Sequence, residues 1–377
     1  LHEVGHTLGL NHNFKASYLH NNEDVHNSEI TSKTGITASV MEYPAINLAP
    51  VGVEQGDYYD VRPGPYDVWA IRYGYTPKLS ENELKEILKE ANKPEHMFAN
   101  DSEDMRYPGR GIDPRAMIYD LSNDPVQYAT NRMDLVNKTQ EELIEKLDKK
   151  AESWEEYRLA HRILIREYGR SLEVISRQIG GVYVERSNPQ NKPYKDPYSP
   201  VPYEEQKRAM QTLQKYAFST EAFPVNADLL RKVQVERRMF DLYTRHEDPQ
   251  MHKIILSIQT SVLNHILNSW TLERISDTEL YGNNYSVYEV FNDLTESIFL
   301  GDNNKASSIR RNIQTTYVRR LIDILSQDSY DEFATAAAYN SLRKIQKIVR
   351  KSSNDLPTKS HRKLISWIIE SGLDSAN

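Results

Sequence analysis

Three histidines and one glutamate at the start of the chain have the spacing of a metal site. His2 and His6 are four residues apart, so a helix would place both imidazoles on one face, where they can bind the same ion. Glu3 would face the same cleft and could hold a water molecule there. Gly9 can adopt the left-handed conformation that ends a helix, which would let His12 return as a third ligand. Three nitrogens and one water are the open coordination of catalytic Zn²⁺.

The composition sets limits on the rest of the protein. The 377 residues are 38% hydrophobic and 27% charged, with a net charge of -7 and no cysteine. This balance is typical of folded globular chains, and it excludes disulfides and cysteine metal sites. No apolar stretch is long enough to span a bilayer. The first residue is not Met and already belongs to the metal motif, so we expect a missing N-terminal portion of the same protein.

The elements that must position the motif follow it along the chain. The stretch from Pro44 to Pro65 is rich in Gly, Pro and Tyr and predicts an irregular loop. A short helix is predicted from Pro65 to Tyr75, with Asp67 in its first turn. Another is predicted from Ser80 to Ala91, where Glu83 completes a capping box.

Beyond this point the pattern becomes mostly helical. Residues 93–130 are rich in turn formers, and residues 139–178 predict a helix with a break near Gly169. Residues 180–184 predict a short strand, and the proline-rich run 188–202 predicts an ordered loop or a domain boundary. From residue 203 to 372 apolar residues recur at helical spacing, which predicts a helical bundle. Its faces run through Ile254, Ile258, Val262, Ile266 and Trp270; through Val318, Leu321 and Leu325; and through Leu342, Ile345 and Val349.

The segment from His2 to His12 resembles the elongated zinc signature of the metzincin clan of metalloproteases. That clan also has a tight turn carrying methionine, and Ser39-Val40-Met41-Glu42-Tyr43 is similar to it. The resemblance implies that Met41 forms an apolar floor under the metal. It also implies that Tyr43 reaches the metal or the transition state, as in astacin-like and serralysin-like members. Without the zinc motif, the same segment would be a core methionine beside an ordinary tyrosine.

A third segment, Tyr66 to Gly74, resembles the last helix of metzincin catalytic domains. The resemblance implies that Asp67 anchors this helix to the Met-turn. The alternative is a carboxylate that the helix dipole favours at any helix N-terminus. Both interpretations stay open at the level of sequence.

Taken together, these patterns predict a mainly α fold with little β structure, in three parts. Residues 1–80 would be the C-terminal part of a metzincin-like catalytic domain, with the end of the active-site helix, the Met-turn and the final helix. Residues 81–200 would form a mixed, mainly helical extension, and residues 201–377 a helical bundle domain. These later regions resemble, less specifically, the C-terminal parts of large bacterial extracytoplasmic proteases, and we expect no catalytic residues from them.

The resemblance implies a zinc-dependent endopeptidase that cleaves a protein or peptide substrate outside the cytoplasm, in the periplasm, at the outer membrane or after secretion. Water activated by Zn²⁺ would attack the peptide carbonyl, with Glu3 as general base and Tyr43 as a hydrogen-bond donor. Leu48, Val51 and Val53 are expected to line an apolar substrate pocket. Metzincins place a substrate-pairing sheet before the zinc motif. We therefore expect the missing N-terminal portion to supply this sheet. The chain alone is expected to bind zinc poorly and to be inactive.

The alternative is a non-catalytic helical binding module with a basic face and a vestigial metal site. Residues 305–363 hold thirteen Lys or Arg against five Asp or Glu. No nucleic-acid motif accompanies them, so we do not expect a nucleic-acid partner. The cluster consists of Arg310, Arg311, Arg319, Arg320, Arg343, Lys344, Lys347, Arg350 and Lys351. Among the other histidines, His20 and His26 are expected to be solvated, and a structural role is expected for His96, His161, His246, His252, His265 and His361.

Overall fold

The computed structural model describes residues 1–187, 189, 195–235, 248–302 and 304–375. The chain forms two compact units: unit 1 comprises Leu1–Leu135 with Gly181–Val201, and unit 2 comprises Val136–Gly180 with Pro202–Asn377. The predicted mainly α fold with little β structure is confirmed. The division into three domains stays a prediction, although residues 81–135 lie in the same unit as the zinc motif. His246 and most of the run 188–194 lie outside the described residues.

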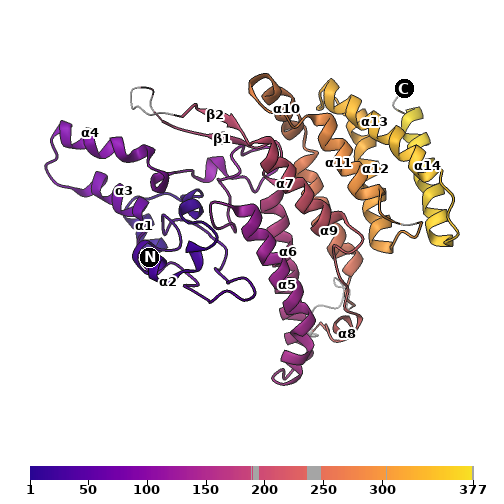
Figure 1. Cartoon of the computed structure of the whole chain (residues 1–377), viewed down its shortest axis with the longest axis horizontal. Helices are drawn as coiled ribbons and strands as arrows, with labels where there is room; N and C mark the ends of the chain where they lie inside the picture. The colour runs from indigo at the N-terminus through magenta and orange to yellow at the C-terminus, as the bar shows by residue number, and fades with distance from the viewer. Residues whose placement is uncertain (188, 190–194, 236–247, 303, 376–377) are drawn as a thin grey trace, which may run out of the picture. The chain divides into compact units, whose positions relative to one another are not determined.

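Unit 1 has short elements joined by long loops (Figure 1). Its α-helices are α1 (His2–Thr7), α2 (Ser28–Thr34), α3 (Pro65–Tyr75), α4 (Glu81–Lys89) and the start of α5 (Pro125–Asp148). Its 3-10 turns are η1 (Ala16–Leu19), η2 (Asp24–His26), η3 (Glu90–Asn92), η4 (Pro94–His96) and η5 (Asp101–Glu103). Strands β1 (Val182–Val184) and β2 (Tyr198–Pro200) pair antiparallel, with Tyr183 opposite Ser199.

The predicted starts of α3 and α4 are confirmed. α3 begins at Pro65 and has Asp67 in its first turn. The hydroxyl of Ser80 accepts a hydrogen bond from the Glu83 amide at 3.3 Å, and the Ser80 amide donates to the Glu83 carboxylate at 2.8 Å. This is the capping box that the sequence predicted.

Two histidines of unit 1 are buried rather than solvated as predicted. His20 is 7% exposed, and its Nε2 lies 2.9 Å from the carbonyl of Gly35. His26 is 6% exposed and stacks on the ring of Tyr128. Burial lowers the pKa of His26, because charging the imidazole would cost solvation that the interior does not replace. The polar residues beside His20 and His26 in the sequence therefore did not indicate that these two side chains are buried.

Unit 2 is a set of packed helices. It comprises the remainder of α5, then α6 (Trp154–Ser176), α7 (Tyr203–Leu213), the π-helical turn η6 (Gln214–Phe218), α8 (Ala227–Leu230), α9 (Met251–Ile266), α10 (Ser269–Thr278), η7 (Glu279–Tyr281), α11 (Val287–Phe299), α12 (Ser308–Ser326), α13 (Glu332–Val349) and α14 (Leu356–Ser375). α12 contacts α9, α13 and α14, and α13 also contacts α11. None of the helices in the described residues combines the length and the apolarity that crossing a membrane requires.

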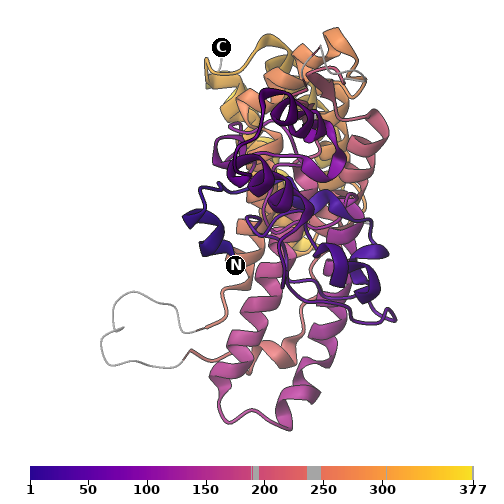
Figure 2. The same cartoon turned by 90° about the vertical axis from the view of Figure 1, so that its left-hand side faces the viewer.

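Two sequence expectations about these helices are wrong. Gly169 does not break a helix; it lies within α6, where an added Cβ would come 3.4 Å from Ile258. The break occurs instead between α5 and α6, which run antiparallel (Figures 1 and 2). Trp270 does not continue the apolar face of α9. The side chain of Asn268 caps a new helix, and Trp270 is 58% exposed on it.

The predicted basic cluster is not one continuous face, because Arg310 is buried. The guanidinium of Arg310 is 1% exposed and pairs with Asp302 at 2.8 Å. It also donates to the carbonyls of Ser297 at 2.7 Å and Leu300 at 2.8 Å. The Lys344 ammonium, on α13, pairs with Glu296. Arg310 is therefore an internal donor of unit 2, whereas Lys344 is 33% exposed and pairs with Glu296 on α11.

Replacing Arg310 by Met should destabilise unit 2 by about 3–5 kcal/mol, because Asp302 and several carbonyls would stay buried without their donor. The exposed Arg319 on the same helix provides the matched control, Arg319→Met. Urea unfolding monitored by circular dichroism measures both variants. Equal stability of the two variants would contradict the structural role of Arg310.

Candidate active site

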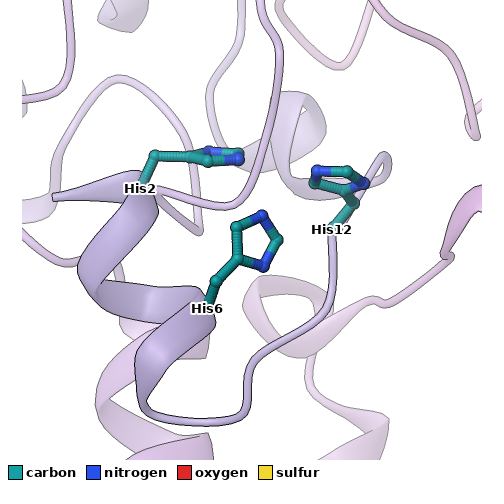
Figure 3. A group of neighbouring side chains, drawn as sticks. All are labelled: His2, His6 and His12. Carbon is teal, nitrogen blue, oxygen red and sulfur yellow. The ribbon is translucent and has the colours of Figure 1, made fainter.

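Helix α1 carries two of the three candidate ligands and ends where the sequence predicted. Gly9 has φ of +86°, in the left-handed region. The amide of Gly9 donates to the His6 carbonyl, and the amide of Leu10 donates to the Gly5 carbonyl, both at 3.0 Å. This pair of bonds is the Schellman motif, which closes the helix and reverses the chain. His12 therefore returns toward the helix face that holds His2 and His6 (Figure 3).

The three imidazoles converge on one point. One ring nitrogen from each of His2, His6 and His12 lies within 4.8 Å of the others, and this is the group of potential metal ligands found among the described residues. Figure 3 shows the three rings directed into a common space. The ring centroids of His2 and His6 are 4.9 Å apart, and those of His6 and His12 are 5.0 Å apart.

Each ring is held by a hydrogen bond from its other nitrogen. The Nδ1 atom of His2 lies 2.7 Å from the Val40 carbonyl, and that of His6 lies 3.0 Å from the Leu10 carbonyl. A carbonyl only accepts, so Nδ1 carries the proton in both rings and Nε2 keeps its lone pair. Outer hydrogen bonds of this kind orient the histidine ligands of metal sites.

The donor set fits Zn²⁺. The Nε2 atom of His2 is buried and has no hydrogen-bond partner among the described residues. An unpaired buried nitrogen costs free energy unless something binds its lone pair. Three neutral imidazoles without cysteine are a common protein ligand set for catalytic zinc. A metal ion would therefore satisfy a group that the protein leaves unsatisfied.

Tyr43 lies over the same cluster. Its hydroxyl is 3.1 Å from Nε2 of His12, and its ring stacks on His2 with centroids 4.8 Å apart. The side chain is 41% exposed, so the hydroxyl lies at the surface of the site. The fully buried ring of Phe14 stacks on the ring of His12, with centroids 5.3 Å apart. The tyrosine can donate a hydrogen bond to an atom held near the histidines.

Asp67 joins helix α3 to the turn that contains Met41. Its carboxylate accepts from the hydroxyl of Ser39 at 2.5 Å and from the amide of Val40 at 2.9 Å. It also accepts from the Gly64 amide at 2.9 Å, just before its own helix. The Val40 carbonyl in this turn is the acceptor for His2. Asp67 therefore supports one ligand indirectly, in addition to any effect of the helix dipole.

Met41 packs directly beneath α1. Its side chain is fully buried, and a Cβ added to Gly5 would lie only 2.2 Å from the Met41 sulfur. The absence of a side chain at position 5 thus allows the thioether to approach the helix backbone between the two ligands. The Met41 carbonyl accepts from the amide of Asn13 at 3.0 Å, which fixes the segment that follows His12.

Residues beyond the predicted catalytic part also reach the site, and the sequence analysis missed them. The Asp101 carboxylate lies 2.8 Å from Nδ1 of His12, although 89 residues separate them. No spacing rule connects these positions. Arg106 and Ile118 line a cavity of about 630 Å³ together with His2 and Glu3.

The wall of this cavity differs from the predicted one. The aliphatic residues of its lining are Leu1, Val40, Pro44, Ala45, Ile46 and Ile118. The predicted Leu48, Val51 and Val53 are not among its lining residues, and the last two are about half exposed (53% and 49%). The amide of Tyr119 donates to the Tyr43 carbonyl, and that of Ala45 to the Asp120 carbonyl. The segment after the turn that contains Met41 therefore pairs with the extension, and its residues 44–46, 59 and 60 line the cavity.

Two buried carboxyls lie behind the Met-turn. Glu42 accepts from the amides of Ser17 and Tyr43, and Asp120 accepts from the hydroxyl of Ser17 at 3.0 Å. Burial raises the pKa of both groups, and each carboxylate further opposes ionisation of the other. The pair is therefore expected to hold at least one proton at neutral pH.

Replacing Gly5 by Ala should destabilise unit 1 by about 1–3 kcal/mol and weaken zinc binding, because the new methyl would displace Met41. The matched control is Gly74→Ala in α3, where an added Cβ meets nothing within 4 Å. That control should be neutral or slightly stabilising. Thermal unfolding and zinc titration measure both effects. A Gly5→Ala variant with the behaviour of the control would contradict the contact.

The carboxyl pair should make unfolding depend on pH. A carboxyl with a raised pKa in the folded state stabilises the fold at acidic pH, and this contribution is lost as pH rises from about 4 through neutrality. Asp120→Asn removes one titrating group, so its free energy of unfolding should fall less steeply over that range than that of the wild type. Urea unfolding at several pH values measures the slopes. Identical slopes would show that Asp120 ionises normally.

Comparison with known proteins agrees with this geometry. A family model described as Met-zincin matches residues 1–306, which include the three histidines, the Met41 turn, Asp67 and the extension. No curated protein and no solved structure matches the chain. The matched region covers most of the sequence, and the chain therefore belongs to the Met-zincin family.

Proposed function

We propose that this chain carries the active site of a zinc-dependent endopeptidase that hydrolyses peptide bonds in protein or peptide substrates. The observation that carries the proposal is the convergence of three imidazoles, each oriented by an outer hydrogen bond, with a buried Nε2 on His2 that has no partner within the part of the chain that the structure describes. Membership of the Met-zincin family supports the same conclusion. An extracytoplasmic location remains part of the proposal and rests on resemblance alone.

His2, His6 and His12 would hold the ion through Nε2, since Nδ1 of each ring is occupied by an acceptor. When bound there, Zn²⁺ would supply Lewis acidity that favours ionisation of water and polarises a carbonyl. The hydrogen bonds that the rings donate to Val40, Leu10 and Asp101 keep the rings oriented before the ion arrives. Such preorganisation reduces the ordering that binding requires.

Glu3 would act as the general base and then the general acid, and Tyr43 would donate a hydrogen bond. Both line the cavity beside the histidines. The Glu3 carboxylate would accept a proton from the attacking water and later donate it to the leaving amine nitrogen. The Tyr43 hydroxyl would donate a hydrogen bond to the oxygen that gains negative charge during the attack. Its partial exposure leaves it accessible to a substrate.

The cavity indicates where the substrate would lie. It has room for a large side chain, and Val40, Ala45, Ile46 and Ile118 make part of its wall apolar. Glu3 and Tyr43 line the same cavity, so the substrate side chain next to the scissile bond would occupy this cavity.

Glu3→Gln should abolish proteolysis while zinc binding is retained. The amide cannot accept the proton of water, and the loss of a general base lowers kcat by roughly 10²–10⁴-fold. The experiment uses the protein at its natural length, loaded with one equivalent of Zn²⁺, and follows cleavage of unstructured fluorogenic peptides. Metal content is measured on the same samples.

The control is Glu81→Gln, which removes an exposed carboxylate that pairs with Lys85 on α4. Glu81→Gln should cleave peptides as the wild type does, and a chelator should stop both. Full proteolysis by Glu3→Gln would refute the role of Glu3. Proteolysis that survives complete removal of zinc would refute the zinc mechanism as a whole.

A further inference from the structure

We infer that Asp101, which lies in the extension beyond the predicted catalytic part, is a positioning residue that holds His12 in its metal-binding orientation. The inference rests on the proposed zinc centre and goes beyond the zinc motif itself. Its main observation is the 2.8 Å contact between Oδ2 of Asp101 and Nδ1 of His12. An ionised carboxylate only accepts hydrogen bonds, so this contact places the proton on Nδ1 and the lone pair on Nε2. The Tyr43 hydroxyl lies 3.1 Å from that Nε2 in this structure, and a metal would take its place there.

The third ligand differs from the other two in what supports it. His2 and His6 lie on one helix, and both donate to backbone carbonyls of nearby structure. His12 lies on an extended segment after Gly9, where no helix restrains its side chain. Its ring plane is set by the stack on Phe14. Rotation of the ring within that plane is restrained by Asp101 on one side and by the Tyr43 hydroxyl on the other.

The backbone around Asp101 is built onto the segment that follows His12. The amide of Phe14 donates to the Ala99 carbonyl at 2.8 Å, and the Asn13 side chain donates to the Met97 carbonyl at 2.9 Å. The side chain of Asn100 then caps the short turn η5 by accepting from the Ser102 amide. These bonds hold the start of η5 beside His12, so the placement of Asp101 follows from ordered backbone.

A purely structural ion pair would not explain this arrangement well. The side chain of Asp101 is 60% exposed, and among the described residues its carboxylate has no hydrogen bond or ion pair besides the one with His12. Pairs with such an exposed partner contribute little to folding stability, typically below about 1 kcal/mol. An outer carboxylate on a ligating histidine, in contrast, commonly changes metal affinity by roughly 10–100-fold. The two roles therefore predict different measurements.

The test compares zinc affinity with stability in the metal-free state. Zn²⁺ is titrated into the full-length protein in competition with a chromophoric chelator at constant pH. Asp101→Ala should bind Zn²⁺ roughly 10–100-fold more weakly than the wild type, and Asp101→Asn, which keeps an acceptor but loses the charge, should lie between them. The melting temperature of metal-free protein should not change. Visible absorption of the Co²⁺-loaded protein should shift in Asp101→Ala, because the field from His12 changes.

Two controls isolate the contact. Ser102→Ala alters the same turn without touching His12, and Glu81→Ala removes an equally negative, exposed carboxylate elsewhere in unit 1. Both should bind Zn²⁺ as the wild type does. An affinity and a Co²⁺ spectrum unchanged in Asp101→Ala would overturn the inference and leave the zinc centre intact. Equal weakening in Glu81→Ala, or a lower melting temperature of metal-free Asp101→Ala, would also overturn it. A wild type that binds no Zn²⁺ would refute the zinc centre and this inference together.

Discussion

Three imidazole rings must present Nε2 to one point while each Nδ1 is bonded to a different part of the chain. The acceptors are the Val40 carbonyl in the Met-turn, the Leu10 carbonyl after helix α1 and the Asp101 carboxylate in the extension. An imidazole ring that rotates freely is a poor ligand, because binding must then restrict it. In the proposed zinc centre, the elements of unit 1 that provide these three acceptors would therefore be as necessary as the histidines.

The turn of residues 39–43, which contains Met41, joins these elements. Asp67 accepts hydrogen bonds from Ser39, Val40 and Gly64, so a single carboxylate joins helix α3 to the turn. Met41 fills the space below α1 because Gly5 has no side chain. The turn thus bonds to one ligand through its backbone and supports the ligand helix through packing. Because the Met41 side chain is apolar, it places no buried polar group beneath the histidines that would need a hydrogen-bond partner.

The extension contributes to this site rather than only following it. Residues 97–99 bond to Asn13 and the amide of Phe14, and residues 118–120 bond to the segment after the Met-turn. Asp101 and part of the cavity wall come from this region. The buried carboxyls of Glu42 and Asp120 lie where the zinc-motif segment meets the extension. Both accept hydrogen bonds from Ser17, Glu42 from its amide and Asp120 from its hydroxyl. A site assembled in this way depends on correct folding of residues 81–135 as well as of the zinc motif.

Local sequence determined the helix ends, the ligand spacing and the mainly α character of the chain. The i, i+4 histidines, the left-handed Gly9 and the capping box at Ser80 each act over a few residues, so a pattern of residue types was sufficient. Tertiary structure alone decided the partner of His12, the burial of His20 and His26, and the role of Arg310 as an internal donor. It also placed the Asp67 carboxylate against Ser39 and Val40, because these contacts require two distant segments to meet. The physical reason is the same in each case: hydrogen bonds and burial between segments tens of residues apart leave no periodic trace in the sequence.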